Sequence, residues 1–270
     1  MTTAAATVPR LRAFGLPRAE TLKLRKRRGL FVVVTLLTIV PQVIAYTVLA
    51  ILHAANPDHH GPAGGFSNLG GGMTALILLG GVAAITVGAA CGADDVNSGV
   101  FRELVVTGRS RVALFGARIP GGLLFLLPFV AAAYTLSAVV SGLANGYLRA
   151  PSTTLLAESG IWVLANAAFY FVVALGLASL TASRAYTIGI LIAWRTIVSH
   201  IISAIGALGA FREVVPDIGF VRLAPRAVAH YVNDGPSDIK PSLVAAVLVP
   251  LLWLVVAIAV GAWRTATRDA

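Results

Sequence analysis

The chain has 270 residues, of which 57% are hydrophobic and only 12% are charged. A soluble globular domain is about 45–50% apolar and about 25% charged. A single water-soluble core could not bury this excess of apolar side chains, whereas a lipid bilayer could accommodate it. The net charge of +10 lies in clusters between apolar runs. That arrangement points to membrane orientation and anionic lipids, and away from nucleic acid.

The N-terminal segment, residues 1–29, is basic and mostly polar. Leu11, Phe14, Leu22 and Leu24 are interleaved with Arg and Lys, and Pro17 is expected to break or kink any helix there. Two interpretations stay open. The segment lies as an amphipathic element on the anionic inner leaflet, or it is a plain tail that sets the topology. The apolar run after it is too long for a signal peptide, so we expect it to be retained.

Six stretches within residues 30–270 are long enough to span a membrane, because a spanning helix needs roughly 20 mostly apolar residues. They are approximately 30–52, 69–93, 112–140, 159–181, 185–208 and 242–263. Their backbone amides would find no water in lipid, so helix is the expected form. The runs do not alternate as the strands of a transmembrane barrel do. The sequence predicts an all-α, polytopic membrane protein with six transmembrane helices.

The positive charges predict that both termini lie in the cytoplasm. Eight Lys or Arg residues precede the first span, four lie in the loop between spans two and three and its margin, one between spans four and five, and two after the last span. The alternate loops hold none, one and four. Short cytoplasmic loops carry the excess of positive charge. The expected topology is therefore N-in/C-in.

The segment between the second and third spans, residues 94–111, has a helical pattern. Asp94, Asp95 and Ser98 are helix-start signals. Apolar residues then recur at helical spacing up to Thr107 and Gly108, which end the pattern. The sequence predicts a short amphipathic helix on the cytoplasmic surface. Such a helix either docks into a groove on a cytosolic partner or is a membrane-parallel connector without a partner.

This segment resembles the coupling-helix region of the permease subunits of type-2 ATP-binding-cassette (ABC) exporters. Those permeases often read as an acidic residue, Gly-Thr-hydrophobic-Arg, Leu-Leu, Thr-Pro-Val-Ser-Arg and Gly-Lys. The corresponding residues here are Asp95, Ser98-Gly99-Val100-Phe101-Arg102, Leu104-Val105, Thr107-Gly108-Arg109-Ser110-Arg111 and Gly116-Ala117-Arg118. Val100, Gly108 and Arg118 depart from the pattern. The stretches 20–28, before the first span, and 223–225, before the last, also resemble the family.

The resemblance implies a plasma-membrane exporter of bacterial type that pairs with itself or with a related chain. It implies two copies of a separate ATPase subunit, which dock on the helix between spans two and three. The residues expected to form this ATPase-coupling helix are Asp94, Asp95, Ser98, Gly99, Phe101, Arg102, Glu103, Leu104, Arg109 and Arg111. It also implies short re-entrant helices in the last external loop, residues 209–241.

The chain carries no phosphate-binding loop of the Gly-x-x-x-x-Gly-Lys-Ser/Thr type, in which backbone amides and a Lys hold the phosphates. Its only lysines, Lys23, Lys26 and Lys240, do not follow a glycine. We therefore expect no cofactor on this chain and ATP hydrolysis on a partner. The mostly apolar spans favour a hydrophobic or amphipathic substrate, such as a lipid, drug or antibiotic, peptide or glycan.

Arg195 lies about ten residues into the fifth span, near the bilayer centre at 1.5 Å per residue. A central Arg costs roughly 2.5–3.5 kcal/mol, so it needs partners. Backbone carbonyls, water, Ser199 or an anionic substrate group are candidates, because no acidic residue is expected inside another span. We predict that Arg195, Ser199 and His200 line the translocation pathway. The alternatives are a shallower Arg195 that extends to the interface and a His200 that is a packing residue with its polar atoms satisfied.

Other chemistry is less well supported. We expect Cys91 to be a small buried apolar residue. His53, Asp58, His59 and His60 read as a solvated loop rather than a metal site, because their spacing matches no known ligand set. An ion-coupled carrier would need acidic residues in the membrane. An intramembrane enzyme would need a catalytic constellation that these spans lack, and a non-transporting scaffold is a further alternative.

Overall fold

In the computed structural model, residues 15–106, 108–225 and 241–268 are described, and they form helices and turns without a strand. Six segments are long and apolar enough to cross a membrane. These are α2 (Arg28–Ala55), α3 (Phe66–Asn97), α5 (Arg111–Leu143), α6 (Thr153–Thr181), the segment Arg184–Ala204 and α11 (Leu243–Thr267). The chain is a multi-pass membrane protein, which confirms the predicted fold class.

The fifth span is not one regular helix. It consists of α7 (Arg184–Ala193), a π-helical turn η1 (Trp194–Val198) and α8 (Ser199–Ala204). The shorter elements are α1 (Gly15–Lys26), α4 (Val100–Val106), the 3₁₀ helix η2 (Gly206–Val214) and α9 (Pro216–Arg222). Single π-turns inside α-helices are rare. Those that occur are often found at functional sites.

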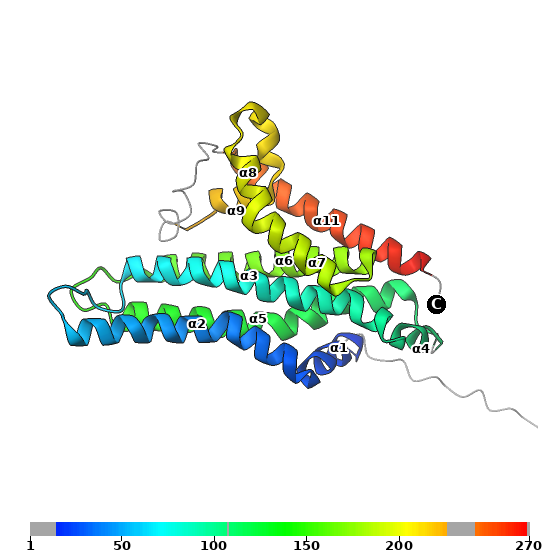
Figure 1. The fold of residues 1–270 in the computed structure, drawn as a ribbon, viewed down its shortest axis with the longest axis horizontal. Coiled ribbons are helices and arrows are strands. Elements are labelled where there is room, and N and C mark those ends of the chain that lie inside the picture. The colour runs from blue at the N-terminus through cyan, green and yellow to red at the C-terminus, as the bar shows by residue number, and fades with distance from the viewer. Residues whose placement is uncertain (1–14, 107, 226–240, 269–270) are drawn as a thin grey trace, which may run out of the picture.

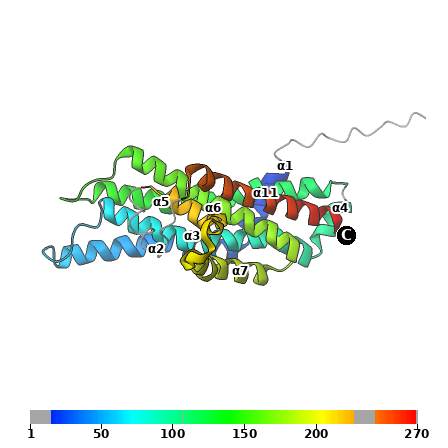
Figure 2. The same ribbon diagram turned by 90° about the horizontal axis from the view of Figure 1, so that it is seen from above.

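The long helices α2, α3, α5 and α6 run side by side along the longest axis of the molecule (Figure 1). One end carries α1, α4 and the C-terminal end of α11, and we call it the basic end. The α2–α3 and α5–α6 connections lie at the opposite end, which we call the loop end (Figures 1 and 2). α7 and α8 rise obliquely from this block, together with η2 and α9 (Figure 1).

Small residues bring the two central helices, α3 and α6, into close contact. A side chain at Gly88 would collide with the carbonyl oxygen of Phe171, and a Cβ at Gly92 would lie 2.7 Å from that of Leu175. This Gly-x-x-x-Gly spacing lets helix backbones approach closely in a membrane. α3 and α6 are the most buried spans, and α11 is the least buried.

Serine side chains begin four of the long segments. In each case the hydroxyl oxygen accepts a hydrogen bond from the backbone amide three residues later, which satisfies one free donor of the first helical turn. These residues are Ser110 before α5, Ser152 before α6, Ser183 before α7 and Ser242 before α11.

Pro17 does not interrupt α1, so the predicted break there is wrong. The proline stands in the first turn of Gly15–Lys26, where its missing amide hydrogen breaks no helical hydrogen bond. Leu24 is fully buried, and the Thr21 hydroxyl donates to the Gly121 carbonyl of α5 at 3.0 Å. α1 is therefore packed against the bundle; Leu11 and Phe14 lie outside the described residues.

After α8 the chain turns through η2 and returns as α9, which packs against α6 and α11. The indole of Trp162 in α6 donates to the Phe220 carbonyl at 3.0 Å. The indole of Trp253 in α11 donates to the Val214 carbonyl at 3.1 Å. Part of the predicted external loop is thus a helix held by two tryptophans. Residues 226–240 of that loop lie outside the described part of the chain.

Candidate functional site

Asp94 and Asp95 belong to the last turn of α3, so the helix start predicted there is wrong. α3 runs on through Asn97, and the Ser98 hydroxyl donates to the Asp94 carbonyl at 2.8 Å, at the C-terminal cap of α3. The amphipathic helix of this segment is the shorter α4. Its predicted end at Thr107 lies outside the described residues. Gly99 and Gly108 flank α4 with φ of +75° and +80°, a conformation that favours glycine.

Asp95 is the centre of a buried ionic cluster at the basic end. Its Oδ2 accepts from Arg118 Nη2 of α5 at 3.1 Å and from Lys23 Nζ of α1 at 2.9 Å. Asp95 is 2% exposed and Arg118 is 1% exposed. A buried charge must be paired, so this cluster explains how α3 can carry acidic residues in its final turn. Nearby, Arg27 is ion-paired with Asp94.

Phe101 anchors α4 to this cluster. Its ring lies under the Arg118 guanidinium, with the Cζ atom 5.8 Å from the ring centroid, and the residue is buried. Arg118 therefore contacts both the end of α3 and the inner face of α4. A cation–π contact with a desolvated Arg adds to the apolar packing.

The other side of α4 is open at the basic end. Arg102 and Glu103 are exposed, and Val106 is 83% exposed. Leu104 is half-buried. Of the two arginines after α4, Arg109 is half-buried and Arg111 donates to the Ala266 carbonyl in the last turn of α11 at 3.2 Å. The structure thus divides the predicted coupling residues into an anchoring set and an exposed set.

Arg195 is buried, at 8% exposure, within the π-turn η1. Its Nη2 donates to the Ile77 carbonyl of α3 at 2.8 Å, and its Cζ lies 4.2 Å from the centroid of the Tyr170 ring. A Cβ at Gly81 of α3 would lie 2.5 Å from Nη1. The guanidinium is therefore enclosed between α3 and α6. Nη1 has no hydrogen-bond partner among the described residues.

Ser199 and His200, which were predicted to line the pathway with Arg195, differ in burial. Ser199 is buried and its hydroxyl donates to the Arg195 carbonyl at 3.0 Å. His200 is exposed. Arg195 and Ser199 are thus brought together inside the bundle, while His200 lies at its surface.

Asp217 is the residue that sequence reasoning missed. It lies within residues 209–241, the predicted last external loop, and no acidic residue was expected inside the other spans. α9 instead places Asp217 within the bundle, where it accepts a hydrogen bond from the Tyr170 hydroxyl. Burial raises the pKa of the Asp217 carboxyl, and the charge of Arg195 opposes that shift. The local signal was Pro216-Asp217, a proline and an acid at a helix start.

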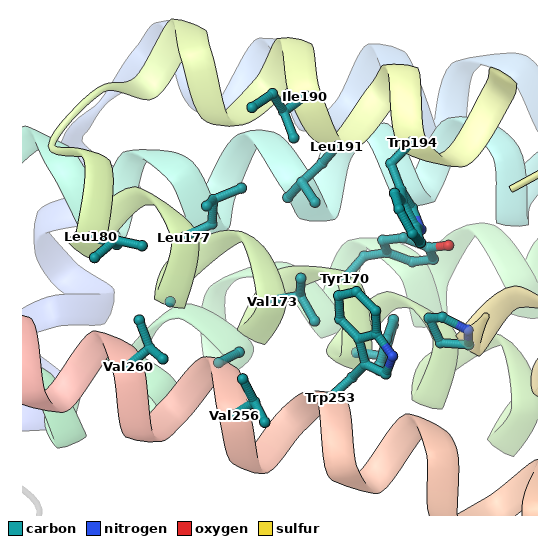
Figure 3. A pocket seen from close by; sticks show the side chains of 14 residues that line it. Tyr170, Val173, Leu177, Leu180, Ile190, Leu191, Trp194, Trp253, Val256 and Val260 are labelled. Carbon is teal, nitrogen blue, oxygen red and sulfur yellow. The ribbon is translucent and has the colours of Figure 1, made fainter. Parts of the chain in front are cut away.

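An apolar cavity of about 370 Å³ lies between α6, α7 and α11 (Figure 3). Leu191 and Trp194 come from its α7 side, Val256 from α11, and Tyr170 and Val173 from α6. The Trp194 and Trp253 rings meet at the same end of the cavity, with centroids 5.6 Å apart. Arg195 does not line this cavity, since it lies on the face of the Tyr170 ring and reaches α3.

No protein-family model matches this chain, and no curated protein matches it at a significant level. Within the described part of the chain, no group of three or more His, Cys, Asp or Glu side chains is placed to hold a metal ion.

Proposed function

We propose that this protein is the membrane-spanning permease subunit of an ABC exporter. In this proposal it pairs with a second permease and binds two copies of a separate ATPase subunit. The observation that carries the proposal is α4, a short helix between two spans with one face anchored to the bundle and the other face open. The resemblance of the surrounding residues to the family's coupling-helix motifs supplies the class of partner.

The ionic cluster supports a coupling role for α4. A helix that transmits force must be joined to the spans that it moves. Phe101 contacts Arg118 of α5, and Arg118 is bonded to Asp95 of α3. Lys23 adds α1 to the same cluster. A partner pressing on α4 would therefore act on α1, α3 and α5 together, and could open the permease pair outward when the ATPase dimer closes on ATP.

The proposal places the basic end in the cytoplasm. Exposed arginines and lysines on and near α1, among them Arg18, Arg25, Lys26 and Arg28, lie at this end, and positive residues favour the cytoplasmic side. Such residues also suit anionic lipid headgroups. Because no lysine follows a glycine, the chain has no phosphate-binding loop of the Walker type, and in this proposal the partner subunit binds ATP. The apolar cavity favours a hydrophobic or amphipathic substrate over a small ion.

Co-purification from native membranes tests this proposal. The tagged wild-type chain should bring down a stoichiometric subunit with a Walker sequence, identified by mass spectrometry, and ATPase activity. Val106→Asp should reduce that yield at least tenfold, because it places a charge on the open face of α4. Leu143→Asp is the matched control, since Leu143 is 82% exposed at the loop end, and it should leave the yield unchanged. A wild-type preparation without such a subunit would argue against the proposal.

One observation favours a second candidate, a proton- or ion-coupled carrier. Such a carrier needs acidic residues in the membrane, and α9 brings Asp217 to Tyr170 of the fourth span. Reconstituted protein without any ATPase separates the two. A carrier would accumulate substrate when a pH gradient alone is imposed, whereas the exporter subunit would be inactive until its ATPase and ATP are added.

A further inference from the structure

Asp217 is a half-buried residue, and only one of its two carboxyl oxygens has a hydrogen-bond partner among the described residues. Its Oδ1 accepts a hydrogen bond from the Tyr170 hydroxyl. Its Oδ2 is buried and has no hydrogen-bond partner among the described residues. An ionised carboxylate is expensive to bury unless its oxygens are paired. This geometry suits a neutral carboxylic acid better than an anion.

Arg195 does not neutralise Asp217 by a direct contact. Within the described residues no ion pair joins them, because Arg195 Nη2 is bonded to the Ile77 carbonyl and the guanidinium lies over the Tyr170 ring. Its charge still acts on the carboxyl through space. Tyr170 therefore lies between the two groups: its ring faces the cation and its hydroxyl faces the acid.

Ser199 is the other polar side chain that approaches the Asp217 carboxyl. Its own hydroxyl hydrogen is used, since it donates to the Arg195 carbonyl at 3.0 Å. While that bond is in place, Ser199 Oγ is free to accept a further hydrogen bond. A protonated Asp217 could donate to it without breaking the bond to Arg195.

We propose that Asp217 is a proton-binding site that controls the docking of α9. With α9 docked, a proton from water is bound at Oδ2 and the acid can donate to Ser199. When α9 leaves the bundle, the carboxyl meets water, the O–H bond breaks and the proton returns to solvent. No electron is transferred. This inference goes beyond the proposed function and does not depend on whether an ATPase drives transport.

The sign of the pH dependence follows from burial. The docked carboxyl holds its proton more tightly than a hydrated one, so docking is favoured at acidic pH. It weakens as the pH rises through the range in which docked Asp217 ionises. The groups that act on the Asp217 carboxyl are Tyr170 from α6, Arg195 from η1, and Ser199 and the exposed His200 from α8. A protonated His200 would favour the carboxylate, so its contribution must be tested separately.

Intrinsic tryptophan fluorescence reports the docking, because Trp162 donates to the Phe220 carbonyl within α9 and Trp253 donates to the Val214 carbonyl just before α9. The full chain is placed in phosphatidylcholine nanodiscs and titrated from acidic to alkaline pH with acrylamide as quencher. Wild type should show one transition toward stronger quenching as the pH rises. Asp217→Asn, which cannot ionise, should stay weakly quenched throughout.

Two further variants identify the group that titrates. Tyr170→Phe removes a donor that favours the carboxylate, so the transition should persist and move to higher pH; a merely structural loss would not move the midpoint in that direction. His200→Gln should retain the transition, and any shift should be toward higher pH because a positive charge that favours the carboxylate is removed. The proposal is overturned by a wild type without a transition, by an unchanged transition in Asp217→Asn, or by its loss in His200→Gln. If Asp217→Asn does not elute as a monodisperse species, the direction of the Tyr170→Phe shift decides.

Discussion

Arg118 donates to Asp95 across 3.1 Å, and both side chains are almost completely buried. These two residues join α5 to the end of α3, and Arg118 also supports the ring of Phe101 in α4. The cluster thus has two consequences. It makes an acidic turn of α3 stable, and it fixes the position of the only short helix that follows a span at the basic end in the described part of the chain.

Asp95→Ala is expected to destabilise the protein strongly, because it leaves Arg118 buried without its anionic partner. Breaking a buried pair in this way costs about 3–5 kcal/mol. The measurement is thermal unfolding of the detergent-solubilised protein. Asp94→Ala is the control, since its ion pair with Arg27 is partly exposed and such pairs contribute about 0–1 kcal/mol. Equal shifts in the two variants would contradict a structural role specific to Asp95.

Gly88→Ala is expected to separate α3 from α6. The added Cβ would collide with the Phe171 carbonyl oxygen, which is backbone and cannot rotate away. Overpacking of this kind costs about 1–3 kcal/mol. Gly116→Ala in α5 meets no atom within 4 Å and should stabilise its helix by about 0.5–1 kcal/mol. A higher melting temperature for Gly88→Ala than for Gly116→Ala would show that the α3–α6 contact is not tight.

Arg195→Leu is expected to reduce transport without a large change in the stability of the protein. The substitution removes the cost of burying a charge, which offsets the loss of the hydrogen bond to Ile77 and the contact with the Tyr170 ring, so the melting temperature should change little. Transport should fall sharply if the enclosed guanidinium is part of the moving machinery. Gly81→Ala tests the same residue from the opposite side, because the new Cβ would push against Nη1. Full transport at wild-type expression in Arg195→Leu would end this interpretation.

The six spans could be predicted from the sequence because each contains an apolar run of spanning length, and that property needs no tertiary information. The C-terminal end of α3 could not be predicted from the sequence. The apolar run stops at Ala93. The helix continues because Asp95 forms ion pairs with Lys23 and Arg118, which are distant in the sequence. The continuation depends on packing partners that a local pattern does not contain.

Asp217 was missed for a related reason. The segment around it is short, mixed in polarity and without a clear period, so it resembles an external loop. Its position is set by contacts from other helices, namely the indoles of Trp162 and Trp253 and the hydroxyl of Tyr170. Conversely, Arg195 was identified because a single charge inside an apolar run is visible in the sequence, although its carbonyl partner on α3 was not.

The account depends on α4 facing the cytoplasm, and sidedness of labelling tests this most directly. In a Cys91→Ala background, Val106→Cys and Leu143→Cys place thiols at opposite ends of the bundle, and both native positions are highly exposed. A membrane-impermeant maleimide should label Val106→Cys only in inside-out vesicles and Leu143→Cys only in intact cells. Labelling of Val106→Cys from outside intact cells would contradict the proposed coupling to a cytoplasmic ATPase.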